Sequence, residues 1–182
     1  MKTLEELLLG KKTQILRKWL DLILNTYPLD AHRLLKHQKD QFLNPVGSTI
    51  SKEIGVLFDE LIQGINAERT SRALDEIIGI RAIQDFSPSK AISFIFLLKR
   101  ILREEILKEM REAGFAEQLL VLESRLDETA LLAFDLYMRR REKMYEIRAN
   151  EAKNQVSALL RKKGLLSEAP AWNPDPEQKN IE

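Results

Sequence analysis

The sequence predicts an all-α protein: a single helical-bundle domain of five to six helices with a long projecting C-terminal helix. Two observations support this fold class. Apolar residues recur every three or four positions through most of the chain, which is the period of a helix. Residues 116–163 contain neither proline nor glycine, so one helix can run through all of them.

The first helix begins after Thr3, because a threonine followed three residues later by a glutamate (Glu6) is a capping box. Its apolar positions continue to Ile23, and Gly10 weakens the helix without necessarily ending it. Pro28 ends it, because the residue before a proline is forced out of the helical region. A short element is expected over residues 30–41.

Two further helices are expected between residues 48 and 84. Asn44, Pro45 and Gly47 form a turn, after which Ser48 or Thr49 can cap a helix with apolar positions up to residue 65. A loop follows at residue 66, and the next helix, over residues 69–84, ends at a turn of residues 85–86.

The best-defined helix start is at Ser87 and Pro88, since serine caps a helix and proline fits its first turn. Residues 91–102 are apolar around most of the helix circumference, which is typical of a central, buried helix. The charged second half, residues 103–112, is expected to lie in solvent until Gly114 ends the helix.

The last helix would be roughly 70 Å long at about 1.5 Å per residue, whereas a compact domain of this size is only about 30 to 40 Å across. Part of it should therefore project. An apolar seam on alternating four- and three-residue steps predicts a helical partner, either a second copy in a homodimer or another protein. The seam consists of Leu131, Met138, Tyr145, Ala149, Ala152, Val156 and Leu159. The alternative is that these residues pack on the bundle of their own chain.

We predict three parts: a sensory or interaction domain (1–135), an extension of the last helix (136–163) and a disordered tail (164–182). The tail contains prolines among polar residues, which favours disorder. Its Trp172 is either a hydrophobe that packs back on the domain or a docking anchor for another protein.

Composition excludes several function classes. The 182-residue chain contains no cysteine, which rules out disulfides, thiolate metal sites and thiol nucleophiles, and its net charge is only +1. Residues 136–163 nevertheless contain nine basic and three acidic residues. A basic helix could bind nucleic acid or an anionic membrane, but a solvated helix face is favoured. No apolar stretch is long enough to span a bilayer, and we predict a cytoplasmic protein.

Candidate catalytic residues are scarce, so no enzyme activity, cofactor or metal is predicted. His32 and His37 are the only histidines, and a spacing of five places them on different helical faces. Either could bind haem iron alone in a globin-like sensor, but a structural or exposed histidine is favoured. Phosphate-binding loops and nucleophile motifs are absent from the sequence.

Four stretches follow one another in a recognisable order: residues 14–19 (QILRKW), 42–47 (FLNPVG), 57–61 (LFDEL) and 80–96. Together they resemble the N-terminal domain of the RsbRD type of RsbT co-antagonist, over roughly residues 4–141. The resemblance implies an all-helical sensory module, comparable to the non-haem globin-like sensors of the stressosome. Such domains are usually followed by a STAS domain that controls the kinase RsbT, but too few residues follow Lys163 for one, and we carry over no kinase-antagonist output. Members without a STAS domain are associated with membrane-bound electron-transfer complexes, so a subunit role there is an alternative.

The resemblance makes five matched positions the candidate ligand- or partner-binding residues: Arg81, Gln84, Asp85, Ser87 and Pro88. A purely structural explanation is also open, because Ser87 and Pro88 cap a helix and Arg81 can pair with Asp85 four residues on. The leading hypothesis is a non-enzymatic, all-helical regulatory module that senses a ligand or binds a protein partner, as a dimer through the helix over residues 131–159. The signal would leave through the long helix, by a change of register or partner along its seam.

Overall fold

A computed structural model describes residues 3–28, 32, 35, 42–84, 86–107 and 115–164. Within these residues the chain is helical and contains no strand. The helices are α1 (Leu4–Gly10), α2 (Lys12–Leu24), α4 (Pro45–Gln63), α5 (Ala67–Ile83), α6 (Pro88–Leu107) and α7 (Ala116–Lys162). The predicted fold class and the long C-terminal helix are confirmed. Several predictions fall wholly or largely outside the described residues: the end of the helix at residue 114, the element over residues 30–41, His37, Asp85 and Trp172.

The chemistry of the helix ends explains where the elements begin. The Thr3 hydroxyl accepts from the Glu6 backbone N–H, and the Glu6 carboxylate accepts from the Thr3 N–H, so the predicted capping box is confirmed. The first helical stretch is not continuous, however. Gly10 ends α1, and Lys11 separates it from α2.

The predicted start of α4 is wrong by one turn. Pro45 is the first residue of α4, and the Asn44 side chain caps it by accepting from Gly47 N–H at 2.8 Å. Because proline has no N–H to satisfy, it fits the first turn. Asn66 likewise caps α5 and does not open a loop. The chain can turn sharply between α4 and α5 because Gly64 adopts a φ of 136°.

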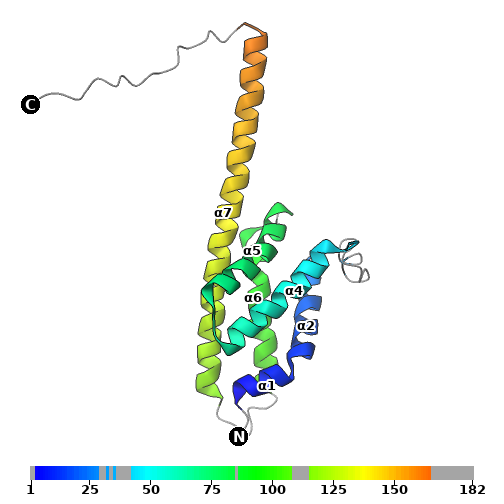
Figure 1. Cartoon of the computed structure of the whole chain (residues 1–182), viewed down its shortest axis with the longest axis vertical. Coiled ribbons are helices and arrows are strands. Elements are labelled where there is room, and N and C mark those ends of the chain that lie inside the picture. The colour runs from blue at the N-terminus through cyan, green and yellow to red at the C-terminus, as the bar shows by residue number, and fades with distance from the viewer. Residues whose placement is uncertain are drawn as a thin grey trace, which may run out of the picture. The chain divides into compact units, whose positions relative to one another are not determined.

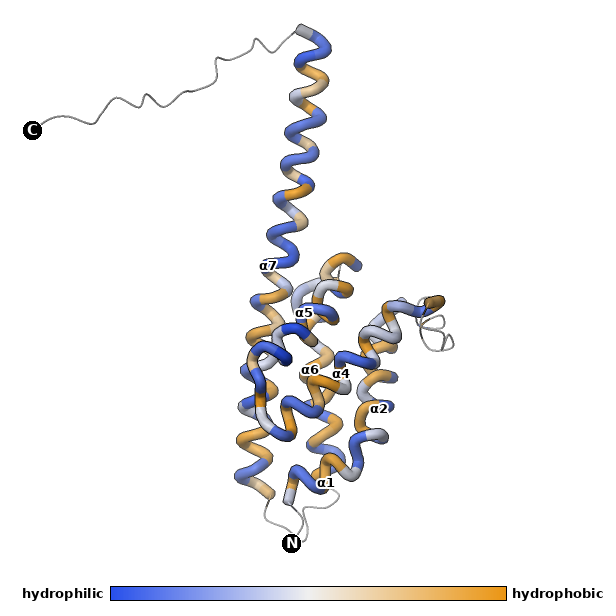
Figure 2. Tube along the Cα trace, viewed as in Figure 1, coloured by the Kyte–Doolittle hydropathy of each residue, from blue (hydrophilic) through white to orange (hydrophobic). Residues whose placement is uncertain are grey.

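Contacts divide the chain into two units, Met1–Arg141 and Glu142–Glu182. The first unit contains the core, to which all six helices contribute. α4 packs along α5 and α2 along α6, and the first part of α7 contributes Leu122, Leu126 and Ala130 (Figure 1). The predicted buried position of α6 is confirmed, since Phe94 and Leu98 are completely buried, and apolar residues predominate along it (Figure 2).

The charged end of α6 departs from expectation at one residue. Glu105 is only 2% exposed and binds Lys11 at 3.2 Å and Lys18 at 2.6 Å. This carboxylate therefore joins α6 to the α1–α2 junction and to the middle of α2, whereas the sequence predicted a solvated face there.

The second unit contains the rest of α7. None of its described residues is buried, and hydrophilic and apolar positions alternate along it (Figure 2). The three-part division at residues 135 and 163 stays a prediction.

Candidate functional site

The five predicted ligand residues do not form one cluster in the described structure. Arg81, in the last turn of α5, is completely buried. Gln84, Ser87 and Pro88 are exposed, and Asp85 lies outside the described residues. Ser87 occupies the start of α6, where its carbonyl accepts from Ala91 N–H at 2.8 Å. Arg81 is therefore the residue around which a site can be built.

Aromatic rings surround the Arg81 guanidinium. Just beyond α5, Phe86 N–H donates to the Arg81 carbonyl at 3.3 Å, and this turn brings the Phe86 ring to 4.3 Å from Cζ of Arg81. The rings of Tyr27 and Phe94 lie 5.6 Å and 6.0 Å from the same atom. Tyr27 also meets Phe86 edge to face, with 5.1 Å between the ring centres. We call these four residues (Arg81, Tyr27, Phe86 and Phe94) the Arg81 cluster.

The hydrogen bonds of this guanidinium are incomplete. Nη2 donates to Thr26 Oγ1 at 3.1 Å and to the Lys90 carbonyl at 2.8 Å. Nε and Nη1 have no hydrogen-bond partner among the described residues, and neither has the buried Tyr27 hydroxyl. No carboxylate in the described part of the chain pairs with Arg81. Since buried charges in proteins are normally paired, this is an unusual arrangement.

Burial determines the electrostatics of the cluster. It lowers the pKa of Arg81 from its ordinary value, and nearby Tyr27 opposes this shift in part. The guanidinium nevertheless stays protonated, as arginine does throughout proteins. Burial also raises the pKa of Tyr27, again offset in part by the neighbouring charge. At neutral pH the cluster therefore presents a positive charge beside a neutral hydroxyl.

The cluster is connected to α7 through the α5–α6 turn. The Tyr137 hydroxyl donates to the carbonyl of Phe86, and Tyr137 is only 2% exposed. Arg141 Nη1 lies 3.4 Å from the Ala82 carbonyl, within hydrogen-bond distance. Phe86 thus contacts the buried charge with its ring and α7 with its backbone.

Comparison with known families gives one result. The family model described as the RsbT co-antagonist protein RsbRD N-terminal domain matches residues 13–152. The chain belongs to this family. No curated protein and no solved structure matched it.

Membership in the RsbRD N-terminal family indicates a regulatory sensing module of the stressosome type. The family consists of regulatory co-antagonist domains that act through protein interactions, and it is not known as enzymatic. Among the described residues, no helix combines the length and the apolar character that a membrane span requires.

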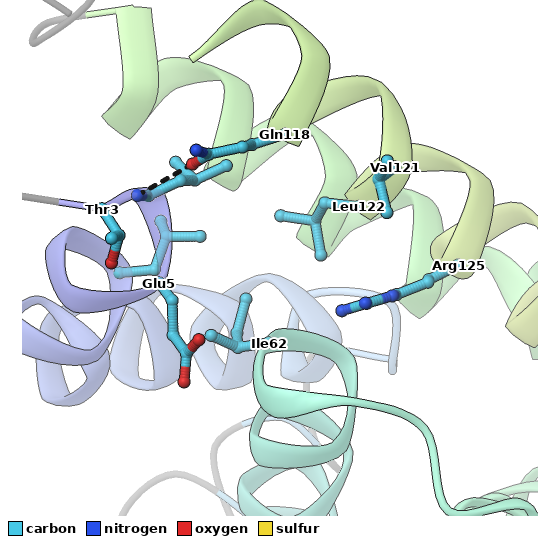
Figure 3. Close-up of a pocket in the computed structure, with 9 residues that line it drawn as sticks. Thr3, Glu5, Ile62, Gln118, Val121, Leu122 and Arg125 are labelled. Atoms are coloured by element: carbon cyan, nitrogen blue, oxygen red, sulfur yellow. Dashed lines mark hydrogen bonds between the residues drawn. The ribbon is translucent and has the colours of Figure 1, made fainter.

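A second feature of this RsbRD N-terminal domain is a cavity of about 350 Å³ between α1, the end of α4 and the beginning of α7 (Figure 3). Gln118 of α7 accepts from Leu4 N–H at 3.0 Å, and Arg125 donates to the Leu61 carbonyl at 3.1 Å. Both polar side chains thus already bind backbone groups across the cavity. They fix α7 to α1 and α4, and we assign the cavity no ligand.

The sequence offered two histidines as candidate haem ligands. His32 is half-buried and its Nε2 has no hydrogen-bond partner among the described residues, while His37 lies outside them. In the described ranges no group of three or more potential metal-binding side chains occurs.

The predicted seam residues of α7 are all exposed. In the first unit, Leu131 is 68% and Met138 38% exposed, and in the second Tyr145, Val156 and Leu159 are 55%, 55% and 63% exposed. Ala149 and Ala152 are exposed as well.

Sequence reasoning missed most of the residues around Arg81. Tyr27 was interpreted only as the end of a helix and Phe86 only as part of a turn, while Phe94 and Tyr137 carried no special signal. The available clue was that Arg81, Tyr27 and Phe86 all lie at or just beyond helix ends. A single sequence does not reveal which helix ends meet.

Proposed function

We propose that this domain is a non-enzymatic regulatory sensing module in which the Arg81 cluster is the sensing site and α7 is the output helix. One observation supports the assignment above others: Phe86 packs its ring on the Arg81 guanidinium and accepts a hydrogen bond from Tyr137 of α7. If a change at the guanidinium displaces the Phe86 ring, it also displaces the Phe86 backbone carbonyl, to which Tyr137 of α7 donates a hydrogen bond.

The proposed output surface is the apolar seam of α7, from Leu131 to Leu159. Exposed apolar residues on four- and three-residue steps favour a helical protein partner. Asp135 and Glu142 occupy seam positions, and two copies in register would bring like charges together there. We therefore favour another helical protein over a homodimer.

Tyr137→Phe tests the connection between the two sites. The variant keeps the buried ring and removes the hydroxyl that binds Phe86. Loss of one such hydrogen bond, about 1 kcal/mol, should raise amide hydrogen exchange near residues 86 and 137 by roughly fivefold. Ile147→Ala, at an exposed position of the same helix that lies away from the seam, is the control. Unchanged exchange in Tyr137→Phe would contradict the proposed connection.

Native mass spectrometry of the full chain purified from its own host tests the output surface. We expect a complex with a second protein that is lost in the double variant Val156→Ser, Leu159→Ser. Ile147→Ser is the control, because Ile147 is 56% exposed but lies away from the seam on the same helix. A homodimer that the double variant dissociates would instead identify the partner as a second copy. A monomer with no partner would refute the seam.

A further inference from the structure

The buried Arg81 guanidinium carries a positive charge, and no carboxylate among the described residues pairs with it. Of the five N–H groups of Arg81, the two on Nη2 bind neutral oxygens, and the three on Nε and Nη1 bind nothing among the described residues. Each unsatisfied buried polar group requires an explanation, and an absent ion or water is a recognised one. A bound anion would accept hydrogen bonds from the unused N–H groups and would neutralise the positive charge of the guanidinium.

The surroundings indicate where such an anion would enter. Tyr27 is 7% exposed and Phe94 is completely buried, whereas Phe86 is only half-buried. Phe86 is also the ring nearest to the guanidinium and lies on a short turn between helices. Of the three rings in the Arg81 cluster, the Phe86 ring can therefore move with the least loss of packing.

We propose that Arg81 binds a small oxyanion, a carboxylate or a phosphate, which reaches the guanidinium when the Phe86 ring moves aside. This names the ligand class of the sensing site, and it rests on the function proposed above. Tyr27 supplies a second, neutral donor, because its hydroxyl is buried, unpartnered among the described residues and next to the charge.

Charge and enclosure explain why an oxyanion fits better than a neutral ligand. Hydrogen bonds between guanidinium and carboxylate or phosphate are about twice as strong as neutral ones. Exclusion of water strengthens them further. Movement of Phe86 would also change the group that Tyr137 binds, so that occupancy is transmitted to α7.

The test observes the guanidinium directly in the full chain. Arginine labelled with ¹⁵N gives an Nε–Hε resonance for each side chain in NMR spectra, and Arg81→Lys identifies the one from Arg81. Sodium acetate and sodium phosphate are titrated separately, each against sodium chloride at equal ionic strength. The exposed Arg100 on α6 is the internal control.

We expect a saturable shift of the Arg81 resonance with acetate, phosphate or both, none with chloride, and no saturable shift at Arg100. A response to acetate alone identifies a carboxylate ligand, and a response to phosphate alone a phosphate. Phe86→Ala should speed exchange of the Arg81 Hε proton with water, since the covering ring is removed. No saturable response to either anion would overturn the proposal.

An internal counter-ion is the competing explanation, and Asp85→Asn tests it. If this variant shifts the Arg81 resonance as strongly as an added anion, the guanidinium is paired within its own chain and the proposal is wrong. The outcomes also separate this inference from the proposed function. Anion binding without a change in α7 exchange refutes the connection to α7 but keeps the oxyanion site. A connection that Tyr137→Phe disrupts, without anion binding, refutes only the ligand class.

Discussion

Replacement of Arg81 by methionine should leave the domain folded and nearly as stable as wild type. The groups that Arg81 binds remain satisfied without it. The Thr26 hydroxyl still donates to the Ile23 carbonyl at 2.6 Å, and the Lys90 carbonyl still accepts from Ser93 Oγ at 2.8 Å. The unbranched thioether of methionine suits a pocket of aromatic rings.

Opposing contributions set the size of this effect. Hydrogen bonds from a charged donor contribute about 1.5 to 3 kcal/mol each, and cation–π contacts contribute about 2 kcal/mol at a desolvated site. Against them stands the desolvation of a buried charge, which costs several kcal/mol. Since Arg81→Met leaves no described carboxylate unpaired and both acceptors keep another donor, it should change the free energy of unfolding by less than about 1 kcal/mol. If Arg81 were one half of a buried ion pair, the loss would be about 3 to 5 kcal/mol.

Urea denaturation and thermal melting of the full chain measure this difference. For a chain of this length 1 kcal/mol corresponds to about 2 to 4 °C in Tm, so we expect a change under about 4 °C. Arg100→Met provides the baseline for an exposed arginine on α6. A fall of about 10 °C or more in Arg81→Met, with Arg100→Met unchanged, would refute the reasoning and identify Arg81 as a structural charge.

Three further predictions concern two glycines of α4 and Glu123 of α7. Gly55→Ala should stabilise the domain by about 0.5 to 1 kcal/mol, since a Cβ there meets no atom within 4 Å in mid-helix. Gly47→Ala should destabilise it by about 1 to 2 kcal/mol, because a Cβ would lie 2.4 Å from the Asn44 amide that caps the helix, and chemical denaturation compares the two variants. The hydrogen bond from Arg103 lowers the pKa of Glu123 below its ordinary 4.5, so the stability that this group adds is present above pH 4.5 and lost as the pH falls. Melting curves from pH 6 to pH 3 should therefore decline less steeply in Glu123→Gln, and equal slopes would contradict this.

Helix positions were predictable because their signals are local. The Thr3 capping box, the start at Pro88 and the uninterrupted run from residue 116 each depend on residues within one or two turns. The error at α4 occurred where two caps compete over a few residues, Asn44 against Ser48. Asn44 also donates to the Leu35 carbonyl, nine residues away, which the local capping pattern does not show.

The candidate site was predicted only in part. The family resemblance brought attention to Arg81, but it grouped Arg81 with Gln84, Ser87 and Pro88, which the structure places in solvent. Neighbouring residues at a helix end have different surroundings, because successive residues of a helix project their side chains in different directions. The true neighbours of Arg81 come from the end of α2, the beginning of α6 and the α5–α6 turn.

By itself, the sequence determined the all-helical class, the length of α7, the absence of thiol chemistry and the apolar seam. Each of these depends on composition or on periodicity within one helix. The tertiary structure decided that Arg81 is buried without an acidic partner among the described residues, that Glu105 is buried between two lysines, and that Phe86 contacts both Arg81 and α7. Burial and pairing depend on which helix ends meet, and packing of the whole bundle determines that.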